Sequence, residues 1–114
     1  MEFTAMKLTI IESPYAGDVD ANIGYARRCV KDSLSRGESP VASHLLYTQP
    51  GILDDDIPEE RQLGIDAGLA WRRVAEQTVV YTDRGISNGM EYGIRLAMQS
   101  GIPVIYRSLP AGSR

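Results

Sequence analysis

Residues 78–107 read TVVYTDRGISNGMEYGIRLAMQSGIPVIYR, and this stretch decides the fold class. Residues 78–82 are β-branched or apolar, as in a strand covered on both faces, and polar residues follow directly. Ser87 is a suitable N-cap for the next helix, and Gly101 ends that helix before a closing strand over 103–106. Such a unit predicts a parallel sheet, in which ligands bind beyond the carboxyl ends of the strands and beside helix N-termini.

The same alternation of strand and helix runs through the rest of the chain. Residues 7–12 (KLTIIE) predict a strand, and apolar residues recurring at three and four positions predict a helix over about 20–36, stopped by Gly37. Residues 39–47 (SPVASHLLY) predict an edge strand, because Pro40 lacks the N–H that a central strand would need.

A further helix is expected after the loop over residues 48–57. Asp56 and Glu59 have the spacing of a capping box, and Pro58 suits the first helical turn. The apolar residues expected to face the sheet are Ile23, Ala26, Val30 and Leu34 in the first helix, Leu63, Ala67, Ala70, Trp71 and Val74 in the second, and Met90, Ile94, Ala97 and Met98 in the third.

Strands that alternate with helices predict a three-layer α/β sandwich on a four-stranded parallel sheet, Rossmann-like or flavodoxin-like, with strand order 2-1-3-4. We expect one domain over residues 1–114, with flexible ends at 1–6 and 108–114. The strand order reverses between the first and third strands. The turns at 13–18 and 83–89 should therefore lie side by side at the switch point.

Composition argues against several classes of function. The formal charge of −3 gives no basic field for nucleic acid, and no apolar run approaches the roughly 20 residues of a membrane span. Cys29 is the one cysteine and His44 the one histidine, so the sequence predicts neither an intramolecular disulfide nor a zinc cluster. Without an intramolecular disulfide, we expect a cytoplasmic protein. GxGxxG and Walker patterns are absent, and we expect a small-molecule partner and no cofactor.

Two polar turns carry the candidate binding groups. Residues 13–18 (SPYAGD) combine a hydroxyl, a stackable ring and a carboxylate, a mixture that suits a sugar or a nucleobase. The alternative is a plain turn in which Asp18 or Asp20 caps the following helix. The second turn presents N–H groups at a positive helix end, where a phosphate or ribose hydroxyls would bind unless Ser87 is only a cap.

His44 and the acidic run Asp54-Asp55-Asp56 allow further interpretations. His44 is expected near the carboxyl end of the second strand, where it is either a base or ligand contact or a structural histidine. The aspartates could bind a divalent cation, but a solvated loop with helix capping explains them more simply. No metal site is predicted.

The SPYAGD loop, Asn22, and the SHLLY, DDDIPEER and DRGISxGM segments together resemble the nucleoside 2-deoxyribosyltransferase superfamily, in a small branch encoded largely by phages and bacteria. The resemblance covers residues 7–107 and implies the same α/β fold, a nucleoside- or nucleotide-type ligand, and a homo-oligomer. With the resemblance, the candidate ligand-binding residues are Ser13, Pro14, Tyr15, Gly17, Asp18, Asn22, His44, Asp83, Gly85, Ser87, Gly89 and Met90.

The resemblance also implies a carboxylate nucleophile in the third helix, four residues beyond Gly89. That position holds Gly93 in this chain. Glu91 is two residues away, and at about 100° per residue it points roughly 200° around the helix. Glu91 and Asp83 are therefore only weak catalytic candidates.

Three functions remain open at this point. The first is a protein that binds a nucleotide-derived molecule without turnover, as a phage would need to sequester a host defence signal. The second is an N-glycosidic hydrolase or transferase, with Glu91 or Asp83 as the carboxylate and Tyr15 or His44 assisting. The third is a protein-interaction module that packs Tyr106, Leu109 and exposed aromatic residues against a partner.

Overall fold

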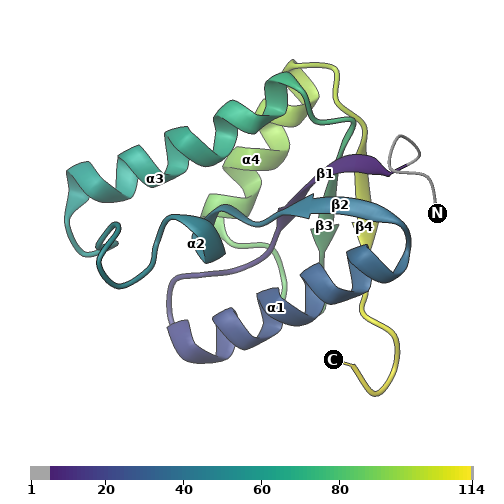
Figure 1. Cartoon of the computed structure of the whole chain (residues 1–114), viewed down its shortest axis with the longest axis horizontal. Coiled ribbons are helices and arrows are strands. Elements are labelled where there is room, and N and C mark those ends of the chain that lie inside the picture. The colour runs from purple at the N-terminus through teal and green to yellow at the C-terminus, as the bar shows by residue number, and fades with distance from the viewer. Residues whose placement is uncertain (1–5, 114) are drawn as a thin grey trace.

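The computed structural model describes residues 6–113. Its strands are β1 (Lys7–Glu12), β2 (Glu38–Val41), β3 (Gln77–Tyr81) and β4 (Val104–Arg107), and its helices are α1 (Val19–Ser35), α2 (Ser43–Leu46), α3 (Pro58–Ala70), the 3-10 turn η2 (Trp71–Arg73) and α4 (Asn88–Gln99). All strand pairs are parallel and the order is β2-β1-β3-β4 (Figure 1). The predicted fold class and strand order are confirmed.

The sheet buries a different apolar cluster on each face. On one face Ile11 and Val79 pack with Tyr25 and Cys29 of α1. On the other face Val80 packs with Met90 and Ile94 of α4. Every residue of β3 is buried, as its continuous apolar run predicts for a central strand covered on both sides. In Figure 1, α1 lies below the sheet, while α3 and α4 lie above it. The three predicted layers are therefore present.

The second strand is shorter than its sequence suggests. β2 ends at Val41, and the SHLL segment forms the short helix α2 instead of continuing the strand to residue 47. β2 pairs only with β1, over four residues, so nothing on its outer side holds the chain extended beyond that ladder. The edge position is confirmed. His44 consequently reaches the carboxyl edge of the sheet from a helical turn and not from a strand.

The buried face of α1 is displaced by one position from the predicted stripe. The structure buries Ala26 as predicted, but it also buries Tyr25, Cys29 and Ser33, and Leu34 is 49% exposed. Met98 of α4 is also exposed, although Met90, Ile94 and Ala97 are buried as predicted. Polar side chains on the inner face of α1 explain the shift, because Ser33 is held there by a hydrogen bond that a count of apolar residues cannot register.

Helix α3 packs through glycines and not through its large apolar residues. Gly64 and Gly68 are its buried positions, and a Cβ on Gly68 would overlap Ser43 of α2. Leu63, Trp71 and Val74, which were predicted to face the sheet, are exposed. A close approach between two helices selects small residues, so the predicted stripe for α3 is wrong.

The predicted capping box of α3 does not form. Ile57 is the N-cap and accepts no side-chain bond from the helix, although Pro58 occupies the first turn as expected. Glu60 instead accepts a hydrogen bond from the Asp54 N–H at 2.9 Å. The acidic loop is thus tied to the helix through Asp54 and Glu60 and not through the predicted pair Asp56 and Glu59.

The segment after β4 belongs to the fold at Leu109. This side chain is 1% exposed, and its N–H donates to the Asp83 carboxylate at 3.0 Å. The predicted flexible end over 108–114 is wrong at this residue, while residues 1–5 and 114 lie outside the described part. Within residues 6–113, no helix combines the length and apolar character needed to cross a bilayer.

Candidate functional site

A cavity of about 360 Å³ opens at the carboxyl edge of the sheet, where ligands bind in folds of this class. Its walls come from the end of β1 and the loop after it, from α2 and α3, and from the N-terminus of α4. We call it the inner cavity. Six of the predicted binding residues line it, namely Ser13, Tyr15, His44, Ser87, Gly89 and Met90.

The loop after β1 and the short helix α2 meet in this cavity through Ser13, Tyr15 and His44. The Ser13 hydroxyl lies 3.5 Å from His44 Nε2, and the ring of Tyr15 lies against the imidazole with a centroid distance of 5.4 Å. Burial lowers the pKa of His44 to about 4. The imidazole is therefore neutral near pH 7, and it offers one donor and one acceptor nitrogen.

The N-terminus of α4 forms the opposite wall. The Ser87 hydroxyl accepts a hydrogen bond from the Met90 N–H at 3.3 Å, so Ser87 is the N-cap that the sequence predicts. The first N–H groups of a helix have no intrahelical acceptor, and Asn88 and Gly89 carry two of them at the cavity. This wall suits an oxygen acceptor of a ligand.

Several predicted site residues serve the fold and do not line the inner cavity. Asp83 accepts hydrogen bonds from the Tyr25 hydroxyl at 2.7 Å and from the Leu109 N–H, which connects β3, α1 and the C-terminal segment. Asp18 caps α1 by accepting from the Ala21 N–H. The other predicted site residues outside the cavity lining are Pro14, Gly17, Asn22, Gly85 and Glu91.

Asn22 nevertheless shapes the cavity from behind. Its side-chain amide donates to the carbonyl oxygens of Tyr15 and Ala16, at 2.9 and 3.1 Å. The first turn of α1 thereby fixes the path of the loop that carries Tyr15. Asn22 is therefore a positioning residue for the ring and does not itself line the inner cavity.

Glu12 is the cavity residue that the sequence reasoning missed. It is the last residue of β1, and its carboxylate lies against Gly93 of α4, where an added Cβ would overlap it. Burial raises the pKa of Glu12 to about 8, and no hydrogen bond or ion pair joins its carboxylate to another residue within 6–113. A protonated carboxyl group therefore faces the cavity near neutral pH.

Two features of the sequence point to Glu12 in retrospect. A glutamate closes an otherwise apolar run that becomes a covered strand, and Gly93 interrupts the buried face of α4. Either feature alone is common. Together they indicate an acidic side chain and a space left open for it, but the pairing of β1 with α4 is needed to see this.

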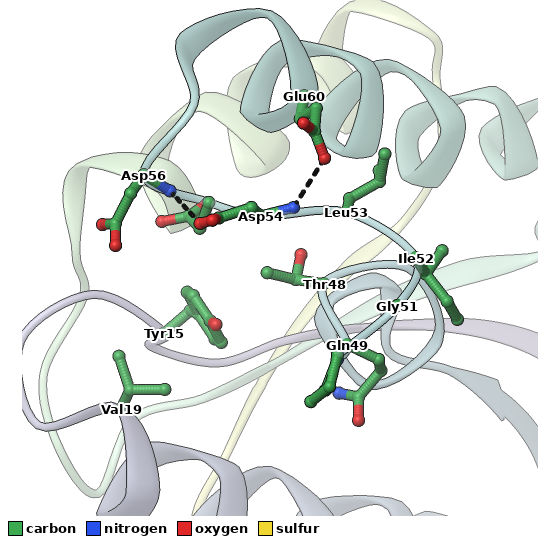
Figure 2. Close-up of a pocket in the computed structure, with 12 residues that line it drawn as sticks. Tyr15, Val19, Thr48, Gln49, Gly51, Ile52, Leu53, Asp54, Asp56 and Glu60 are labelled. Atoms are coloured by element: carbon green, nitrogen blue, oxygen red, sulfur yellow. Dashed lines mark hydrogen bonds between the residues drawn. The ribbon is translucent and has the colours of Figure 1, made fainter.

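A second cavity of about 490 Å³, the outer cavity, adjoins the first (Figure 2). The two share Tyr15, Thr48 and Asp55 in their walls. Figure 2 shows Tyr15 on one side of the outer cavity, with Asp54 and Asp56 on the other. The pKa of Tyr15 is raised by burial first and by the three aspartates second, which indicates a negative potential at its hydroxyl.

The acidic run has its own internal bonds. The Asp56 N–H donates to the Asp54 carboxylate at 2.9 Å, and Asp55 lies 3.9 Å from the guanidinium of Arg61. Across the described residues, no group of three or more histidine, cysteine or acidic side chains is arranged to hold a metal ion.

Comparisons with known proteins give one match. No curated protein and no solved structure matches the chain. The sequence profile of one family, described as a domain of unknown function, DUF7768, matches residues 7–107, which span all four strands. The chain therefore belongs to the DUF7768 family.

Proposed function

We propose that the inner cavity binds a nucleoside- or nucleotide-derived small molecule. The observation that carries the proposal is a cavity of about 360 Å³ at the carboxyl edge, in which the Tyr15 loop and the N-terminus of α4 face each other. That volume lies within the range of about 300 to 1,000 Å³ that small-molecule sites occupy.

The lining groups suit a sugar joined to an aromatic base. Ser13, His44 and the N–H groups of Asn88 and Gly89 can bond to sugar oxygens, because each offers a hydrogen-bond donor at the cavity wall. The exposed face of Tyr15 can stack on a base, and it borders both cavities. A protein that held such a molecule unchanged would act by sequestering it, which is the role suggested by the resemblance to small phage-encoded relatives.

Mass spectrometry of small molecules released from the purified, heat-denatured protein tests this proposal. A nucleoside-type ligand is expected, and the same compound should raise the melting temperature in proportion to the logarithm of its concentration above Kd. No released ligand, together with no thermal shift across nucleosides, nucleotides, cyclic nucleotides and ADP-ribose, would refute the proposal.

Tyr15→Ala locates the binding site. Loss of base stacking should weaken binding by about 1 to 3 kcal/mol, which corresponds to roughly 5- to 150-fold. Tyr106→Ala is the matched control, because Tyr106 is 54% exposed on β4 and lines neither cavity. Equal losses in the two variants would place the ligand elsewhere.

Glu12 supports a second candidate function, the cleavage of an N-glycosidic bond. Its carboxyl occupies the space beside Gly93, the position at which the resemblance implies a catalytic glutamate. Since the pKa of Glu12 is about 8, the group is mostly protonated near pH 7 and suits a proton donor. In such a reaction the leaving base takes the Glu12 proton as the glycosidic bond breaks, and water then adds to the sugar carbon and returns a proton to the Glu12 carboxylate.

Release of free base from a panel of nucleosides and nucleotides, followed by chromatography, tests the second candidate. Glu12→Gln should abolish release while leaving binding in place, because glutamine keeps the shape and a hydrogen-bond donor but has no acidic proton. Unchanged ligand recovered in full from the wild-type protein would rule out cleavage and leave the binding proposal standing.

A further inference from the structure

The charges around the two cavities are mostly negative. Asp55 lines both cavities, and Asp54, Asp56 and Glu60 line the outer one, whereas the Glu12 carboxyl of the inner cavity is protonated near neutral pH. Arg61 is the one cation among the residues that line either cavity in the described chain, and its guanidinium already faces Asp55 at 3.9 Å. A phosphate that entered either cavity would therefore meet carboxylates without a free cationic partner.

Glu12 lines the inner cavity without a hydrogen-bond partner among residues 6–113. Only a minor part of the residue reaches solvent, and its carboxyl is directed at the Gly93 face of α4 on the wall of the inner cavity. No donor among residues 6–113 bonds to it, whereas Ser33, Gln77 and Arg107 all donate to Glu38 of β2. Its oxygens remain open to the cavity, so an occupant of the cavity can supply a partner in place of water.

We propose that the inner cavity selects uncharged nucleosides over their phosphorylated forms, with Glu12 donating a hydrogen bond to a neutral oxygen of the ligand. The inference rests on the proposed function and names which part of that ligand class fits. A neutral carboxylic acid can donate to a sugar hydroxyl or a base carbonyl, whereas an ionised one would only accept. An anionic group placed against Glu12 would keep the carboxyl protonated but would still face the adjoining aspartates.

The pH dependence of binding follows from the same arrangement. The charged and titratable groups that face Glu12 across the cavity are His44 from α2, Asp55 from the acidic loop, Arg61 from α3, Tyr15 and Tyr92. His44 is neutral above about pH 5, because burial lowers its pKa to about 4. Ionisation of Glu12 is therefore the change expected near pH 8, and nucleoside affinity should fall above it.

Calorimetric titration with matched pairs tests the inference. The probes are adenosine, guanosine, cytidine and uridine, each beside its 5′-monophosphate, at neutral pH and physiological salt. The nucleoside that binds should do so at least about tenfold more tightly than its monophosphate. Glu12→Gln should keep that affinity within about threefold and remove the fall above pH 8, whereas Glu12→Ala should lose about tenfold. Glu91→Gln on the exposed face of α4 is the matched control and should change neither quantity.

The outcomes distinguish a failure of the nucleoside selectivity from a failure of the proposed function. If a monophosphate binds as well as or better than its nucleoside, the selectivity is overturned while the cavity stays a nucleotide site held by the N-terminus of α4. If Glu12→Gln weakens binding as much as Glu12→Ala, the donated hydrogen bond is refuted. If no member of any pair binds and no ligand is released on denaturation, the proposed function fails and this inference fails with it.

Discussion

Glu12 and Glu38 are glutamates at opposite ends of neighbouring strands, and the protein treats them in opposite ways. Glu38 accepts hydrogen bonds from Ser33, from Gln77 and from both terminal nitrogens of Arg107, with distances of 2.7 to 2.9 Å. Those bonds, led by Arg107, lower its pKa to about 2. Glu12 has no such partner in the described chain, and burial raises its pKa to about 8.

The contrast separates a structural carboxylate from a candidate functional one. Glu38 uses its oxygens within the fold, where the guanidinium of Arg107 reaches it across the α1 face and also donates to the Tyr81 hydroxyl. Glu12 leaves its oxygens available to the inner cavity. Burial alone does not distinguish the two groups, so the presence or absence of protein partners is the useful criterion.

The largest expected effect comes from removing the partner of Glu38. Arg107→Met leaves a buried carboxylate without its cation and should lower the free energy of unfolding by about 3 kcal/mol. Urea denaturation at neutral pH measures it. Adding Glu38→Gln to Arg107→Met should recover part of the loss, because the uncompensated charge is then gone.

Arg36→Ala is the control for this experiment. Arg36 pairs with Asp32 at 3.0 Å, but its side chain is 43% exposed. The free energy of unfolding should therefore fall by only about 0.5 kcal/mol, as for other surface ion pairs. A loss from Arg107→Met as small as that from Arg36→Ala would show that the Glu38 network adds nothing to stability.

The second prediction concerns pH and gives the two glutamates opposite signs. The folded pKa of Glu12 lies above its ordinary value of 4.5, so its ionisation costs stability progressively as the pH rises from about 4.5 to 8. The folded pKa of Glu38 lies below 4.5, so its contribution is lost as the pH falls from about 4.5 to 2. The slope for either group is at most about 1.4 kcal/mol per pH unit.

Unfolding curves of wild type and Glu12→Gln over that range provide the measurement. The variant should gain stability relative to wild type between pH 4.5 and 8 and show no relative change below pH 4.5. Parallel curves across the whole range would mean that Glu12 titrates normally, and the distinction drawn from its burial would then be lost.

The smallest expected effect is that of Gly93→Ala. The added Cβ would overlap the Glu12 carboxylate, which can swing aside, so the cost should be about 1 kcal/mol. In a Glu12→Ala background the same change should cost nothing, because the space is then free. Thermal unfolding of the four variants in this double-mutant cycle tests the contact, and additive losses would show that the two residues do not touch.

Gly89→Ala is the matched control on the same helix. A Cβ there would meet only the Ser87 hydroxyl at 4.0 Å. The effect of Gly89→Ala on stability should therefore be the same in the wild-type and Glu12→Ala backgrounds.

Much of the fold could be predicted because local pattern and burial coincide in it. β3 is buried throughout and is β-branched or apolar from Thr78 onward, and Ser87 and Gly101 bound α4 as their conformational preferences require. The strand order followed from the alternation of elements alone. Prediction failed where a contact between distant segments decides the outcome. Gly68 against Ser43 turns α3 so that Leu63 and Trp71 point outward.

The candidate site was predictable in its location but less so in its residues. Ser13, Tyr15, His44 and Ser87 reach the inner cavity, because parallel strands bring the turns after them to one edge. Asp83 was a reasonable candidate from the same rule, yet Tyr25 and Leu109 take up its carboxylate. Glu12 was missed because its role depends on an empty position in a helix 81 residues further along the chain, which no local pattern reveals.

The buried side chain of Leu109 also bears on where this domain stops. The family profile closes at residue 107, yet the apolar cluster beneath α1 includes a side chain two positions later. Ending the polypeptide at residue 107 would remove the Leu109 side chain and leave a cavity beside Tyr25, at a cost of about 2 to 5 kcal/mol of stability. A shortened or fused version of this domain should therefore keep Leu109, because the family similarity ends at residue 107 while the packed core extends to residue 109.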